Sequence, residues 1–121
     1  MAENWHLEHF YHTVINVRDL DESVAFYKLL GFEVLNDRRH VEWPDFVAGI
    51  FGMKRAKGRG VLMVLPSDPD GPMIDLIEWV EPKAKLDAIP VADGAVPRII
   101  ASRTKGVHAA HAALTAKGVR F

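Results

Sequence analysis

The sequence contains no cysteine, which excludes disulfides, thiolate metal sites and cysteine nucleophiles. It also has no excess of one charge: 15 basic and 16 acidic side chains give a formal net charge of -1, which argues against a general nucleic-acid surface. Its longest apolar runs, 46–53 and 61–65, are far too short to span a bilayer. We therefore expect a cytoplasmic protein without a membrane or nucleic-acid partner.

What the sequence does contain is typical of one folded domain. A chain of 121 residues with 49% hydrophobic and 26% charged residues can bury a core without cross-links. The N-terminal residues MAENWHLEHFYH lack the basic and apolar regions of a signal peptide. We therefore interpret residues 1–121 as a single domain.

Residues 10–32 contain a strand pattern followed by a helix pattern. Residues 10–17 alternate as a half-buried strand does. Asp19 with Glu22 is typical of a helix N-cap, and Gly31 of a helix stop. The predicted helix has an apolar stripe formed by Leu20, Val24, Tyr27 and Leu30.

The remaining segments extend this pattern. Three further strands are predicted over 32–38, 60–65 and 73–80, with a loop containing a helical turn within 43–53. Residues 10–80 thus have the order β-α-β-β-β. The proline-rich segment 81–97 is predicted to be a linker, followed by a strand over 98–104 and a helix over 107–117.

The second helix repeats the first after a shift of 87 positions. The shift places Gly31 on Gly118, and the apolar positions match as well: Leu20 on Val107, Tyr27 on Leu114 and Phe32 on Val119. A repeat of this kind predicts an α+β fold built from paired βαβββ modules, with residues 98–121 starting the second. Either another chain completes that module or the natural protein continues beyond Phe121. We favour the latter, because an unpaired edge would otherwise remain.

His12 and Asp75 are the residues of greatest chemical interest. Strand alternation puts both on the sheet face opposite the one that the helix covers. An imidazole and a carboxylate from two strands form half of a metal site of octahedral or facial type. A hydrogen-bonded histidine beside a solvated carboxylate is the alternative.

The segments HTVINVRDLDESVAFYKLLGF and DPDGPMIDLIEW resemble the vicinal oxygen chelate superfamily. This superfamily includes glyoxalase I, bleomycin-resistance proteins, methylmalonyl-CoA epimerase and extradiol dioxygenases. The resemblance covers residues 10–121. It implies a curved mixed sheet around a cavity, a homodimer, a small-molecule substrate and a divalent metal ion such as Ni, Zn, Mn or Fe.

The resemblance also implies ligand positions. His12 matches the first metal ligand and Asp75 the second, where relatives commonly have glutamate. Glu78, at the opposite strand parity, is our second choice for that position and a substitute for the catalytic base. Ile99 occupies the third ligand position and cannot bind a metal, and the fourth lies beyond Phe121.

Three further residues are candidates for substrate binding. Arg103 shares strand parity with Ile99, so we expect it to hold an anionic group of the substrate. Trp43 and Trp79 are expected to line an apolar pocket. Phe46 and Phe51 are predicted to belong to the core.

The leading functional hypothesis is a metal-dependent lyase or isomerase of the lactoylglutathione lyase type. The metal would chelate two neighbouring substrate oxygens and act as a Lewis acid. A non-catalytic binding protein of the bleomycin-resistance type is the alternative, and Ile99 favours it. An extradiol dioxygenase is a third hypothesis, but it needs two histidines and a glutamate, and only His12 is in place.

Overall fold

The computed structural model describes residues 5–83 and 99–121. The chain divides into two compact units, Met1–Leu86 and Asp87–Phe121. The predicted linker 81–97 lies outside the described residues from position 84 onward. No helix in the described ranges is both long and apolar enough to cross a membrane.

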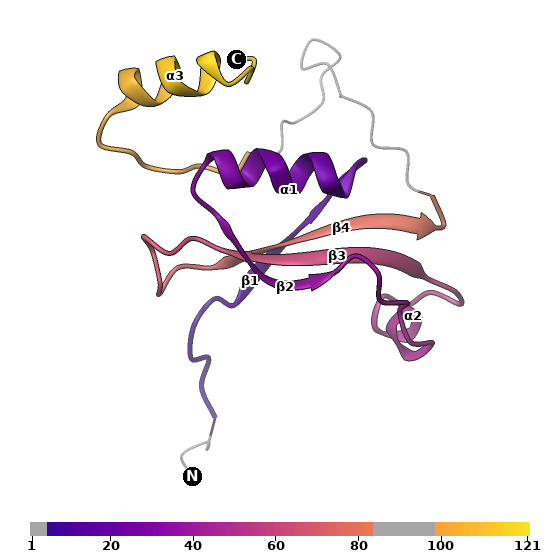
Figure 1. Ribbon diagram of the computed structural model, residues 1–121. Coiled ribbons are helices and arrows are strands. Elements are labelled where there is room, and N and C mark those ends of the chain that lie inside the picture. Colours follow the sequence, from indigo (N-terminus) through magenta and orange to yellow (C-terminus); the bar gives the residue numbers. More distant parts are fainter. Residues whose placement is uncertain (1–4, 84–98) are drawn as a thin grey trace, which may run out of the picture. The chain divides into compact units, whose positions relative to one another are not determined.

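The first unit consists of a four-stranded mixed sheet, one long helix and one short helix (Figure 1). Its elements in chain order are β1 (His12–Asn16), α1 (Leu20–Leu29), β2 (Glu33–Arg38), α2 (Phe46–Ile50), β3 (Lys57–Val64) and β4 (Met73–Glu81). The strand order is β1-β4-β3-β2, with β1 parallel to β4 and the other pairs antiparallel. This arrangement confirms the predicted α+β class.

The core lies between α1 and one face of the sheet, across which α1 runs in Figure 1. Leu20 of α1 and Leu76 of β4 are both fully buried. Burial of a leucine side chain contributes about 1.5–3 kcal/mol, so these contacts fix the helix on this face. The rest of the buried cluster is formed by Val24, Val61, Met63 and Ile74.

Local signals set the ends of α1 as predicted. The Asp19 carboxylate accepts a hydrogen bond from the Glu22 amide at 3.0 Å. Gly31 has a φ of 98°, a backbone conformation that residues with a Cβ rarely adopt. This turn lets the amide of Phe32 bond back to the Tyr27 carbonyl at 3.1 Å.

A bulge in β2 reverses the alternation of its side chains. Val34 pairs with Met63, but the next paired residue is Asn36 with Leu62, so Leu35 is the additional residue. Val34 packs against the core under α1. Because Leu35 adds one residue, the residues after it lie on faces opposite to those that strict alternation predicts.

The second unit contains α3 (Val107–Ala116), which agrees with the predicted helix. Gly118 follows it with a φ of 87°, as Gly31 follows α1. The strand predicted for 98–104 is not present: no strand is assigned to the described residues 99–104. A strand forms only by hydrogen bonding to a neighbour, and the described part of the chain pairs none with this segment.

The Asp19 cap gives a test of how α1 is stabilised. Asp19→Ala should lower the free energy of unfolding by about 1 kcal/mol, because the Glu22 amide loses its acceptor. Urea denaturation measures this change. Asp45→Ala is the matched control, since Asp45 stands at the N-cap of α2 without a side-chain cap bond. Equal losses in both variants would contradict the capping role of Asp19.

Candidate functional site

The sheet face that α1 leaves uncovered brings His12 and Asp75 together. His12 pairs with Met73 across β1 and β4, which makes Asp75 its diagonal neighbour. His12 Nε2 lies 3.9 Å from Asp75 Oδ2, and their side chains are 31% and 26% exposed. The structure therefore juxtaposes the two residues that strand parity had placed on one face.

Asp75 is in an unusual electrostatic environment for a carboxylate. Burial raises its pKa above the ordinary value of 3.8, although the charges of His12 and Arg38 act in the opposite direction. A carboxylate with a raised pKa is a better proton acceptor than an ordinary surface aspartate. Asp75 is thus suited to bind a cation or to accept a proton.

The second ring nitrogen of His12, Nδ1, differs in its surroundings from Nε2. His12 Nδ1 is buried and has no hydrogen-bond partner in the part of the chain that the structure describes. A buried unpaired nitrogen costs roughly 1–3 kcal/mol.

A cavity of about 470 Å³ lies against His12 and Asp75. Its floor is the open face of the sheet, and its wall is the segment from Val41 to Ile50, which includes α2. The wall is mainly apolar, and the floor carries the polar groups. This combination is typical of a small-molecule site. The lining residues on the wall are Val41, Glu42, Trp43, Pro44, Phe46, Val47 and Ile50.

An aromatic cluster supports the wall of this cavity. Trp43 stacks on Phe51 at a centroid distance of 6.0 Å and meets Trp79 edge-on at 5.3 Å. Trp79 donates a hydrogen bond from Nε1 to Asn16 Oδ1 at 2.8 Å. Trp43 is among the residues that line the cavity, whereas Trp79 packs against Trp43 and is not part of the lining.

Gly58 gives Trp43 the space that it occupies. A Cβ at Gly58 would lie 2.5 Å from two atoms of the Trp43 ring. The ring therefore rests on the bare backbone of β3, and any larger residue would displace it.

Phe46 and Phe51 do not belong to the core, contrary to the prediction from sequence. Phe46 is 68% exposed and lines the cavity, and Phe51 is 43% exposed. The reason is that α2 borders the cavity on the open side of the sheet, whereas the buried cluster lies under α1.

Glu78 lies on the other face of the sheet. Its carboxylate accepts hydrogen bonds from Arg59 Nε at 2.8 Å and from the amide of Leu20, the first residue of α1, at 3.3 Å. Both carboxylate oxygens are thus engaged beneath the helix. This placement favours a structural role for Glu78, which joins α1 to the sheet.

Arg103 and Ile99 belong to the second unit, and their part in the cavity stays a prediction. The sequence reasoning missed Arg38, which lines the cavity together with His12 and Asp75. Strict alternation from Val34 would have placed Arg38 under α1. The bulge at Leu35 reverses this placement, and no residue type in β2 predicts a bulge there.

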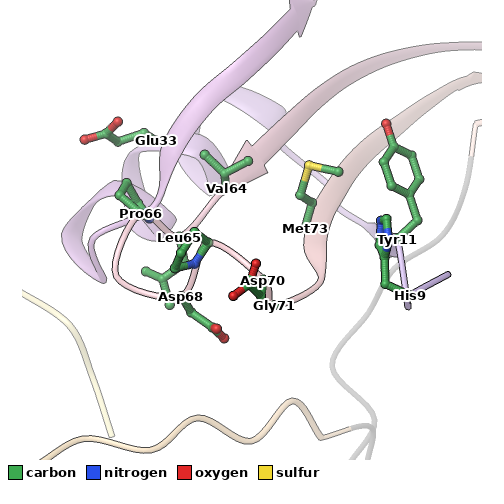
Figure 2. Close-up of a pocket in the computed structure, with 11 residues that line it drawn as sticks. His9, Tyr11, Glu33, Val64, Leu65, Pro66, Asp68, Asp70, Gly71 and Met73 are labelled. Carbon is green, nitrogen blue, oxygen red and sulfur yellow. The ribbon is translucent and has the colours of Figure 1, made fainter.

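A second cavity of about 510 Å³ lies at the turn between β3 and β4 (Figure 2). It is lined by Met73, Tyr11 and His9 and by the acidic turn that contains Asp68 and Asp70. Figure 2 shows that the carboxylates do not converge on one point. In the described residues, no group of three or more histidine, aspartate and glutamate side chains could hold a metal ion.

The fit of a divalent metal to the first cavity is partial. His12 and Asp75 are ligand types that such ions accept, and His12 Nε2 is the nitrogen that faces Asp75. Catalytic zinc sites, however, generally have three protein ligands, and the described residues supply two here. The first unit therefore provides a partial ligand set.

Comparison with known proteins identifies the class of fold and then the family. A solved structure of a glyoxalase family protein from Bacillus cereus matches with a TM-score of 0.74 at 17% identity, covering 98% of this chain and 77% of that one. At this identity the match establishes the fold. The family model for the Glyoxalase/Bleomycin resistance protein/Dioxygenase superfamily matches residues 9–121. The chain belongs to this superfamily, also called vicinal oxygen chelate. No curated protein matches significantly.

The raised pKa of Asp75 predicts a pH effect on stability. Since the pKa is higher in the folded than in the unfolded chain, the stability linked to protonated Asp75 is lost as the pH rises through the folded-state value. Asp75→Asn should therefore gain stability relative to the wild type over that range. Denaturation at a series of pH values measures the difference.

Asp37→Asn is the control with the opposite sign. The hydrogen bonds from Arg39 lower the pKa of Asp37 to about 2, so its contribution is present at neutral pH and is lost as the pH falls through that value. NMR titration should show Asp75 titrating above 3.8 and Asp37 well below it. Similar titration of both carboxyls would contradict the assigned environments.

The contacts of Glu78 predict a structural effect of its removal. Glu78→Ala should lower the free energy of unfolding by about 1–3 kcal/mol, because Arg59 and the Leu20 amide lose a partly buried acceptor. Glu42→Ala is the control, since its bond to Lys57 is exposed and should matter less. A Glu78→Ala protein of unchanged stability that had lost activity would instead assign Glu78 to catalysis.

Proposed function

We propose that the chain is a metal-dependent lyase or isomerase of the glyoxalase type, acting on a small molecule with neighbouring oxygen atoms. The observation that carries the proposal is the approach of His12 Nε2 and Asp75 Oδ2 to 3.9 Å on the floor of a cavity. Membership of the superfamily adds support, because its members often use divalent metals.

In this proposal His12 and Asp75 would hold the ion, with further ligands from water, substrate or the rest of the protein. The ion supplies Lewis acidity toward two substrate oxygens when bound. Trp43 and Phe46 exclude water from one side of the substrate, which strengthens the electrostatic interactions on the floor. The homodimer implied by the resemblance remains a prediction.

Metal binding is the first test of this function. The purified protein, treated with a chelator and reconstituted with Ni²⁺, Zn²⁺, Mn²⁺ or Fe²⁺, should bind about one ion per chain. His12→Ala and Asp75→Asn should each weaken binding by at least about tenfold, since each removes one of two ligands. Calorimetric titration measures the affinity.

His6→Ala is the matched control, because His6 is an exposed histidine outside the cavity. Formation of lactoylglutathione from methylglyoxal and glutathione then tests the activity that the resemblance implies. Stoichiometric metal that both cavity variants retain would contradict the assigned ligands.

A metal-free binding protein of the bleomycin-resistance type is the second candidate. Two observations favour it: Ile99 has no ligating atom, and the described residues contain no group of three histidine, aspartate or glutamate side chains that could hold a metal ion. If no ion binds and a small molecule still occupies the cavity, this second function replaces the first.

A further inference from the structure

Arg38 is the arginine that lines the cavity, and its side chain has no partner among the described residues. Its side chain lines the cavity, is exposed to solvent, and forms no ion pair or side-chain hydrogen bond with any residue in the described ranges. The other arginines near the sheet are engaged: Arg39 with Asp37 and Asp21, Arg55 with Glu81 and Arg59 with Glu78. A guanidinium without a carboxylate, beside a cavity, is available for a ligand.

The direction of Arg38 follows from the bulge at Leu35. After the bulge Asp37 pairs with Val61, which belongs to the buried cluster under α1. Arg39 joins Asp37 to Asp21 of α1, which independently places Asp37 on the helix side. Arg38, the residue between them, therefore projects to the cavity side.

No side chain on the neighbouring strand β3 separates Arg38 from the cavity floor. Arg38 pairs with Gly60 of β3, which has no side chain. The Asp75 side chain lies next to this glycine, since a Cβ at Gly60 would be 3.8 Å from Asp75 Oδ1. The positive charge of Arg38 partly opposes the burial that raises the pKa of Asp75. The cation and the proposed metal ligand thus face the same space.

We propose that Arg38 binds a carboxylate group of the substrate, whose compact apolar body packs against Trp43, Phe46 and Ile50. The planar guanidinium fork matches a carboxylate in a bidentate manner. A doubly charged phosphate fits less well, because Asp75 is close and Arg38 is a single cation. This inference rests on the proposed function, since it uses the same cavity as the ligand site.

The test compares a carboxylate with its neutral amide in the full chain. Phenylacetate and phenylacetamide share an aromatic body and differ in charge. In NMR titrations with a chelator present, phenylacetate should bind at least about tenfold more tightly than phenylacetamide, as expected for a charge-assisted bond. The amide signals that shift should be those of residues 36–38 and 60–62.

Arg38→Gln should abolish this preference while phenylacetamide binding stays unchanged. Arg55→Gln is the matched control: it removes the same charge from an exposed position outside the cavity and should keep the preference. Arg38→Lys should restore part of it, because the charge remains and the fork is lost. Asp75→Asn should strengthen phenylacetate binding, since it removes the repelling carboxylate.

Three outcomes would overturn the proposal: a preference for phenylacetate that persists in Arg38→Gln, signal shifts confined to the second cavity around Gly71, or no binding of either compound. The outcome is separate from that of the metal test, because the chelator removes metal from the titration. If the protein binds metal but shows no preference for the carboxylate, the proposed function is retained and Arg38 has no role in substrate binding.

Discussion

The packing of α1 against one face of the sheet is the constraint on which the other features depend. Leu20 and Leu76 are fully buried in this contact, and Glu78 reinforces it through the amide of Leu20. Since a strand directs its side chains alternately to two faces, burying one set determines which set stays available. His12 and Asp75 belong to the available set, so the helix defines the site without touching it.

The open face is selective in its chemistry because its polar and apolar parts come from different segments. The sheet contributes His12, Asp75 and Arg38, while the segment around α2 contributes the aromatic wall. Two glycines of β3 lie between these parts. Gly58 leaves room for the Trp43 ring, and Gly60 has no side chain to separate Arg38 from Asp75. Small residues in a central strand thus shape the cavity as much as the large residues do.

Local features of the fold were accessible from the sequence. The Asp19 cap, the Gly31 stop and the strand alternation of His12 and Asp75 depend on neighbouring residues, and the structure confirms each. The strand predicted for 98–104 was wrong for the described residues 99–104, because a strand needs a partner and its own pattern cannot supply one. Phe46 and Phe51 were misplaced for a related reason: hydrophobicity does not distinguish a core from a cavity wall.

The sequence by itself determined the βαβββ order of the first unit, the repeated helix with its glycine stop, and the face that His12 shares with Asp75. Tertiary structure alone decided the positions of Glu78 and Arg38. Glu78 is engaged because α1 begins beside it, and Arg38 reaches the cavity because the pairing of β2 with β3 omits Leu35. Register between strands depends on contacts distant in the chain, and a single unpaired residue reverses every face that follows it.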